Sequence, residues 1–216
     1  MSDTEERMPS RFVLSAEELG AMGAHAVARS FPKNAVIVSE GDRTDSLYII
    51  VEGRVKAFVA DSDGKEVVLS TQGAGEYFGE MVLDEGPRSA SIMTLEPCRF
   101  LIVAKADFKD FLARNPAFAA RVIEKLIHRV RSLTENVKSL ALMDVYGRIA
   151  RLLLELAHER AGKLVITERL TQKEIASRVG ASREMVSLIL KDLTAGGYLR
   201  NEGHTIVIER APPPRW

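Results

Sequence analysis

A pair of short capped helices separated by a glycine, near the C-terminal end of the 216-residue chain, constrains the fold most. The stretch reads LTQKEIASRVGASREMVSLILK. Thr171 and Glu174 have the spacing of a capping box that begins one helix, and Gly180 ends that helix and permits a tight turn. Ser182 caps the next helix. Two short helices joined by so tight a turn pack at a steep angle, so the stretch predicts a helix-turn-helix.

The second of these helices presents a polar face that suits DNA. Arg183 and Glu184 lie in its first turn, the end that a recognition helix places against base edges in the major groove. Arginine pairs with both acceptors of guanine and glutamate accepts from the amino group of cytosine. A solvated face would explain the polarity but not the helix-turn-helix frame. The predicted DNA-binding residues are Thr171, Gln172, Ser182, Arg183, Glu184, Ser187, Leu188 and Lys191.

Strand-like runs follow this motif on both sides of residues 201–204, which predicts the hairpin of a winged helix. Arg200 or His204 would then reach a phosphate group, although a hairpin with no contact to DNA fits the sequence equally well.

The distribution of charge also favours a polyanion as the partner of the second half of the chain. Residues 1–110 hold 12 Lys and Arg against 19 Asp and Glu, whereas residues 111–216 hold 18 against 11. Chance segregation of solvated charge is the alternative.

The first half of the chain reads as short strands. Between residues 31 and 103, β-branched and aromatic runs alternate with glycines, and Asp63 with Gly64 marks a hairpin between two such runs. Many short strands at this spacing predict a small antiparallel barrel or sandwich. Before them, Ser15 and Glu18 form a capping box that begins a short helix.

A long helix is predicted over residues 116–142, with Asn115 as its cap and Pro116 at its first position. A heptad seam runs along it, which favours a parallel two-chain coiled coil and hence a homodimer over a helix packed on its own domain. The seam consists of Ala119, Ile123, Leu126, Val130, Leu133, Val137 and Leu140. A short helix is predicted before it over residues 105–115, and an amphipathic helix after it that ends near Gly162.

Several classes of protein are disfavoured by what the sequence lacks. The single Cys98 excludes an internal disulfide and argues against a multi-cysteine zinc or iron–sulfur site. No metal-spaced histidine pair, nucleophile elbow or Walker loop occurs, so we expect no catalytic residues, no metal and no enzymatic activity. No apolar run has the length of a membrane span, and the acidic start MSDTEER is unlike a signal peptide. A cytoplasmic location with no membrane partner is the expectation.

The stretch FGEMVLDEGPRSAS indicates a ligand site among the strands. It places Gly79 and Glu80 before a short apolar run, and Arg88 and Ser89 after it. An acid and a base set apart in this way suit a ligand that carries both a hydroxyl and a phosphate group, since arginine binds phosphate through charge-assisted hydrogen bonds. The alternative is a surface turn in which Glu80 and Arg88 pair with each other.

With this stretch in place, residues 12–210 resemble the catabolite activator (cAMP receptor) and oxygen-sensor superfamily of bacterial transcription regulators, in its cAMP-receptor-like branch. The resemblance rests on GDRTDSLYIIVEGRV, FGEMVLDEGPRSAS, LMDVYGRIARLLLELA and TQKEIASRVGASREMVSLILK. It implies an α+β chain. An N-terminal β-roll, a jelly-roll-like barrel that binds a cyclic nucleotide, would span residues 12–115. The dimerisation helix would span residues 116–142 and a winged helix-turn-helix residues 143–216.

The resemblance also implies roles for the pocket residues. Gly79 would let the backbone approach the ligand, Glu80 would accept a hydrogen bond from the ribose 2′-hydroxyl, and Arg88 with Ser89 would hold the cyclic phosphate. In the cAMP receptor two consecutive hydroxyl residues of the dimer helix contact the adenine. The implied ligand-binding residues are Gly79, Glu80, Met81, Arg88, Ser89, Leu133 and Thr134.

Two departures from the family pattern bear on specificity. Leu133 replaces one of the two base-contacting hydroxyls while Thr134 keeps the other, which leaves cAMP as the leading effector and cGMP or c-di-GMP as competitors. A dinucleotide would need further basic groups such as Arg129 or Arg131. Leu188 stands where the family's activators carry an arginine, so it offers only an apolar contact, for instance to a thymine methyl group.

The function implied is a homodimeric transcription regulator that binds pseudo-palindromic double-stranded DNA under the control of a cyclic nucleotide, without a permanent cofactor. RNA polymerase is a further expected partner. Nucleotide binding would reorient the two helix-turn-helix domains, called the reading heads below, about a hinge at residues 142–145. The alternatives are a regulator of the same fold that acts without a ligand and a cyclic-nucleotide-binding regulatory subunit without DNA function. Whether the protein activates or represses stays open.

Overall fold

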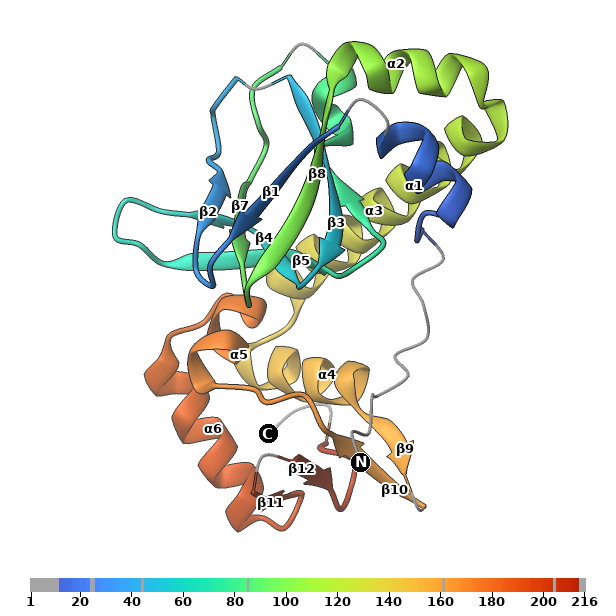
Figure 1. Cartoon of the computed structure of the whole chain (residues 1–216). Helices are drawn as coiled ribbons and strands as arrows, with labels where there is room; N and C mark the ends of the chain where they lie inside the picture. The colour runs from blue at the N-terminus through green and yellow to red at the C-terminus, as the bar shows by residue number, and fades with distance from the viewer. Residues whose placement is uncertain are drawn as a thin grey trace. The chain divides into compact units, whose positions relative to one another are not determined.

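The computed structural model describes residues 12–23, 26–43, 45–84, 86–160, 162–203 and 205–213 (Figure 1). The chain divides into two compact units. One consists of Met1–Val59 and Val68–Arg131, the other of Ala60–Val67 and Ser132–Trp216. The predicted α+β class is confirmed, with strands and covering helices in the first part and a helix-turn-helix with a small sheet in the second.

Two four-stranded antiparallel sheets form the predicted β-roll. The first has the strand order β1-β8-β3-β6 and the second the order β2-β7-β4-β5. The strands are β1 (Val27–Phe31), β2 (Val36–Val38), β3 (Ser46–Glu52), β4 (Val55–Ala60), β5 (Glu66–Gln72), β6 (Tyr77–Phe78), β7 (Ser91–Thr94) and β8 (Cys98–Ala104). Successive residues of β3 face opposite sides. Ile50 joins a core shared by both sheets, whereas Leu47 and Ile49 join a core with the helices.

The hairpin predicted at Asp63 and Gly64 is confirmed between β4 and β5, but its loop is wider than a two-residue turn. The amide of Gly64 donates to the Asp61 carbonyl at 3.0 Å, and the amide of Asp61 donates to the Lys65 carbonyl at 3.1 Å. Gly64 alone in this loop has a positive φ, 76°, whereas the primed two-residue turn needs two such residues. The chain therefore uses three loop residues to reverse.

Two short helices cover the outer face of the first sheet. The capping box at the start of α1 (Ala16–Gly23) is confirmed, because Ser15 and Glu18 exchange side-chain-to-backbone hydrogen bonds of 2.9 and 3.2 Å. Both α1 and α2 (Lys105–Arg114) lie against β8 (Figure 1). The long helix begins at Pro116 as predicted, and the Asn115 carbonyl accepts from the Ala119 amide at 3.0 Å. The side-chain amide of Asn115 donates to the Phe111 carbonyl at 2.8 Å. It therefore closes the end of α2.

The long helix α3 (Pro116–Leu142) carries different residues on two faces. Phe118 and Val122 are buried in the helix-facing core of the β-roll. The predicted seam lies to one side of them, where Ile123 is 58% and Val137 66% exposed. The helix thus packs on its own domain through one stripe and leaves a second apolar stripe uncovered in the single chain.

The second unit combines three helices with a four-stranded sheet of order β11-β12-β10-β9. Its elements are α4 (Val145–Leu156), β9 (His158–Arg160), β10 (Lys163–Ile166), α5 (Gln172–Val179), α6 (Arg183–Ala195), β11 (Leu199–Glu202) and β12 (Thr205–Ile208). The prediction that α4 continues to near Gly162 is wrong. The helix ends at Leu156, because the next residues pair with β10 as β9, and Gly162 with φ of 73° belongs to the connection between the two strands.

Candidate nucleotide pocket and DNA-binding face

Gly79 fixes the geometry of the candidate pocket. It follows β6 and precedes a single 3-10 turn, η1 (Glu80–Leu83), with a left-handed φ of 87°. A Cβ atom at this position would lie 2.8 Å from Nη1 of Arg88 and 3.0 Å from the Ser46 carbonyl oxygen. Only glycine therefore combines this backbone conformation with an arginine packed directly against it.

Arg88 is held in place by backbone carbonyl groups. Its Nη1 donates to the Gly79 carbonyl at 3.3 Å and its Nη2 to the Ser46 carbonyl at 2.5 Å. The amide of Arg88 also donates to the Asp42 carbonyl at 2.9 Å, which fixes the loop before β7. Burial lowers the pKa of the guanidinium, and the nearby negative groups, Glu80 among them, oppose that shift. Arginine remains a cation under such a shift, so the site presents a fixed positive charge.

The predicted pocket residues of the first unit surround one hollow. Ser89 lies at its edge, with its hydroxyl 3.3 Å from the sulfur of Met81. The lining residues include Gly79, Glu80, Met81, Arg88, Ser89, the small Ala90 and Arg129. Leu133 is half-buried and Thr134 is exposed, both within the second unit, so their contact with the base stays a prediction.

Glu80 pairs with a residue that sequence reasoning missed. Its side chain is 4% exposed, and its Oε2 lies 3.7 Å from Nζ of Lys125 on α3. The alternative of a surface ion pair between Glu80 and Arg88 is therefore wrong. The sequence did contain one indication of this partner, the position of Lys125 on α3. Lys125 continues the helical spacing of Phe118 and Val122, which form the stripe that packs on the β-roll. A charge on a buried stripe of a helix needs a partner.

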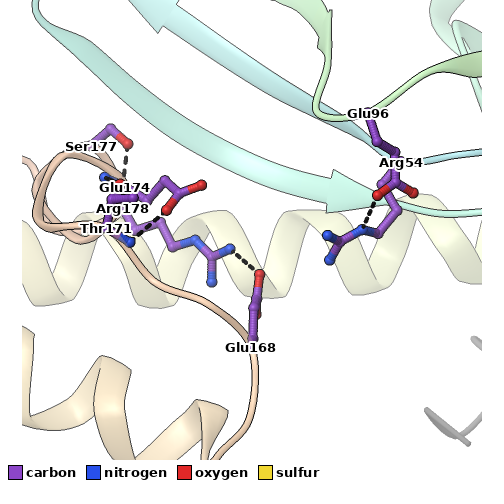
Figure 2. A network of polar contacts seen from close by, with 7 residues as sticks. All are labelled: Arg54, Glu96, Glu168, Thr171, Glu174, Ser177 and Arg178. Carbon is purple, nitrogen blue, oxygen red and sulfur yellow. Dashed lines mark hydrogen bonds and ion pairs between the residues drawn. The ribbon is translucent and has the colours of Figure 1, made fainter. Parts of the chain in front are cut away.

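The helix-turn-helix forms as predicted. The Thr171 hydroxyl accepts from the Glu174 amide at 3.2 Å, and the Glu174 carboxylate accepts from the Thr171 amide at 2.6 Å. Figure 2 shows this pair beside Arg178, which donates to Glu168 at 2.8 Å. The same figure shows the ion pair between Arg54 and Glu96 of the β-roll, 3.4 Å long.

The turn and the second helix also have the predicted caps. Gly180 takes a left-handed φ of 65°, and the Ser182 hydroxyl accepts from the Met185 amide at 3.2 Å. Val186 and Leu193 of α6 are fully buried against α4 and α5. These contacts fix the direction of α6, so its outer face is presented as a rigid surface.

Six of the eight predicted DNA-binding residues gather around one shallow hollow on the outer face of α6. They are Gln172, Arg183, Glu184, Ser187, Leu188 and Lys191. Leu188, the one large apolar side chain among them, is 56% exposed. The wing is confirmed as β11 and β12. Arg200 forms ion pairs with Glu202 and Glu209, and His204 lies outside the described residues.

Arg148 of α4 is a second residue that the sequence did not single out. Its Nε donates to the Val179 carbonyl at the end of α5, and its Nη1 donates to the Met143 carbonyl just after α3, both at 2.8 Å. One guanidinium group therefore joins the end of the long helix to the turn of the helix-turn-helix. In the same unit a Cδ atom of Leu140 would lie 3.2 Å from a Cβ added at Gly180.

Comparison with known proteins agrees with this geometry. Residues 28–115 match the cyclic nucleotide-binding domain family and residues 147–212 the Crp-like helix-turn-helix domain family. The CRP-like cAMP-activated global transcriptional regulator of Mycobacterium tuberculosis is 36% identical over 183 residues, which cover 82% of each chain. The chain belongs to the CRP/FNR superfamily of transcription regulators.

Other relatives of this superfamily extend the likeness. The cAMP-activated regulator CRP of Pasteurella multocida is 32% identical over 194 residues, covering 86% of this chain and 91% of its own. Among solved structures, the c-di-GMP-responsive global regulator CLP of Xanthomonas campestris matches with a TM-score of 0.75 and 28% identity, covering 90% of this chain and 99% of that one. This CRP/FNR chain is thus a DNA-binding, cyclic-nucleotide-responsive regulator in a family that is not one of enzymes. Within the described residues, no helix is long and apolar enough to cross a bilayer.

Proposed function

We propose that the protein is a homodimeric transcription regulator whose affinity for DNA is set by a cyclic mononucleotide, with cAMP as the effector. The observation that carries the proposal is the arrangement around Gly79. There a buried carboxylate, Glu80, and a fixed guanidinium, Arg88, line the same small hollow. A cyclic mononucleotide offers a ribose hydroxyl to the first and a phosphodiester anion to the second. Ser89 at the rim supplies a further donor to the phosphate.

The uncovered stripe of α3 supports the homodimer. A heptad seam with exposed apolar residues, such as Ile123 and Val137, costs solubility in a monomer, and a second copy of the same helix removes it from water. A dimer brings two reading heads together, which suits two half-sites of a pseudo-palindrome about 34 Å apart. RNA polymerase is the proposed further partner, because the relatives are named as global transcriptional regulators.

The effector would act through a population shift. Nucleotide bound beside α3 favours one arrangement of that helix, and the reading heads follow. The ligand contributes only its difference in affinity between the two arrangements, typically about 1–3 kcal/mol. Whether the bound form has the higher or the lower affinity for DNA is decided by which arrangement it favours.

A second candidate effector is c-di-GMP. The structural likeness to CLP favours it, together with Leu133, which offers no hydrogen bond to a base. Arg129, which lines the hollow, is a basic group available to a second phosphate. The two effectors differ in size and charge, so a direct titration separates them.

The test is calorimetric titration of the full-length protein with cAMP, cGMP and c-di-GMP, followed by gel shifts on pseudo-palindromic DNA with and without the best binder. We expect cAMP to bind in the presence of Arg88 and not after Arg88→Leu, and to change the affinity for DNA. DNA binding should weaken steeply with salt, because the contacts release counterions. If none of the three nucleotides binds, or if binding leaves DNA affinity unchanged, the proposal is wrong.

A further inference from the structure

Lys125 carries a buried charge directly behind the nucleotide pocket. Its side chain is 7% exposed, although lysine is rarely buried without a partner. Burial lowers the pKa of the ammonium group, and the charges of Glu80 and Glu76 oppose that shift. The residues that line the hollow include Glu80 and Arg129 but not Lys125. Any effect of Lys125 on the ligand must therefore pass through a neighbour.

Three contacts fix the ammonium group in one place. Its Nζ donates to the Tyr77 carbonyl and lies 3.6 Å above the centre of the Tyr77 ring. The third contact is the Glu80 carboxylate at 3.7 Å. Because Tyr77 is 1% exposed and belongs to β6, the position of the ammonium is set by the β-roll and α3 together. The carboxylate thus meets a cation that cannot move away.

Glu80 keeps hydrogen-bonding capacity in spite of this ion pair. A distance of 3.7 Å is within ion-pair range but longer than a hydrogen bond. Among the residues that the structure describes, Oε2 of Glu80 has no hydrogen-bond donor even though the atom is buried. A buried carboxylate oxygen without a donor is costly, so the site favours a ligand that brings one.

We propose that Lys125 is a positioning residue for the nucleotide, which holds the Glu80 carboxylate toward the pocket so that it accepts from the ribose 2′-hydroxyl. The inference rests on the proposed function and deepens it. The ammonium offsets the negative charge without saturating the oxygens. Without the ammonium group of Lys125, the Glu80 carboxylate is drawn toward the guanidinium of Arg88, with which it already interacts electrostatically. Recognition of the 2′-hydroxyl would then be lost while the phosphate grip is kept.

The test compares cAMP with 2′-deoxy-cAMP, by calorimetry on the full-length protein. The unchanged protein should prefer cAMP by about tenfold or more, since a buried acceptor is left without its donor by the deoxy analogue. In Lys125→Met the preference should fall to less than about threefold, through loss of cAMP affinity, with the affinity for 2′-deoxy-cAMP little changed. Lys125→Arg should restore part of the preference, because it returns a cation. A general structural defect would weaken both nucleotides together.

Lys138→Met is the matched control, because Lys138 lies on the same helix with its side chain 63% exposed. It should leave both affinities unchanged. If Lys125→Met folds and keeps the preference of the unchanged protein, the inference is wrong. If it does not fold, Glu80→Gln and Glu80→Gln/Lys125→Met decide. Their cAMP affinities should agree, and a further loss in the double variant overturns the inference. Absence of cAMP binding by the unchanged protein overturns the proposed function itself, and this inference with it.

Discussion

Replacement of Gly79 by alanine should disable the pocket through Arg88. The left-handed φ of 87° costs an L-residue about 1–2 kcal/mol. The added Cβ would also lie 2.8 Å from Nη1 of Arg88, closer than real Cβ contacts come, and 3.0 Å from the Ser46 carbonyl oxygen, at the tight end of observed contacts. The carbonyl belongs to β3 and cannot retreat, so the guanidinium has to move.

A displaced guanidinium would lose the proposed hydrogen bond to the cyclic phosphate. A bond of this charged type contributes about 1.5–3 kcal/mol, so cAMP should bind about 10- to 150-fold more weakly to Gly79→Ala. Calorimetric titration measures this loss, and thermal unfolding measures the backbone cost separately. The matched control is Gly64→Ala in the β4–β5 hairpin. Gly64 has a similar φ of 76°, but an added Cβ meets no atom within 4 Å.

Both variants should lose comparable stability, and only Gly79→Ala should lose affinity for cAMP. If Gly79→Ala binds cAMP within about twofold of the unchanged protein, the guanidinium is not displaced or does not contact the phosphate, and the reasoning is refuted. An equal loss of affinity in Gly64→Ala would instead assign the effect to general destabilisation.

Three further predictions follow from other parts of the molecule. Burial tends to raise the pKa of Glu18, but Arg121 and Ser15 hold it below its ordinary value of 4.5. Its stabilisation is therefore complete above the unfolded pKa and is lost as pH falls through the lower folded value. Glu18→Gln should lower the midpoint of thermal unfolding at neutral pH by the equivalent of about 1 kcal/mol or less, and the difference from the unchanged protein should vanish in acid. Val137→Glu should convert the proposed dimer to monomer in sedimentation velocity without unfolding the chain, because Val137 is 66% exposed in the single chain; a dimer that persists would place the interface elsewhere. Leu188→Arg should shift the preferred half-site toward an added guanine, worth about 1–3 kcal/mol in a binding-site selection, and an unchanged preference would show that α6 does not enter the major groove at this residue.

The parts of the fold that were predictable depend on neighbours in the sequence. The caps at Ser15, Thr171 and Ser182 join residues three apart, so local chemistry was enough to identify them. The end of α4 was not predictable in the same way. His158–Arg160 follow an amphipathic helix without a breaking residue, and only the pairing with β10 makes them a strand.

The pocket shows the same division. Gly79 and Arg88 share one stretch of sequence, and their hydrogen bond closes a short loop. Glu80 and Lys125 lie 45 positions apart on different elements, so only the packing of α3 on the β-roll brings them together. The family resemblance implied a role for Glu80 as a hydrogen-bond acceptor, but it did not reveal that Lys125 lies behind its carboxylate. The same limit applies to Arg148, whose two acceptors become neighbours only when the second unit folds.

The two hydrogen bonds that Arg148 donates have a consequence for how the protein moves. The connection between α3 and α4 at Met143 is the natural place for a swivel, yet the guanidinium joins its carbonyl to the end of α5. A swivel there must break two hydrogen bonds from a charged donor, each worth about 1.5–3 kcal/mol, which exceeds the coupling energy of about 1–3 kcal/mol that an effector ordinarily supplies. The C-terminal end of α3 and the helix-turn-helix are therefore expected to move together as one rigid body. An effector that changes DNA binding has to bend or shift α3 before that end.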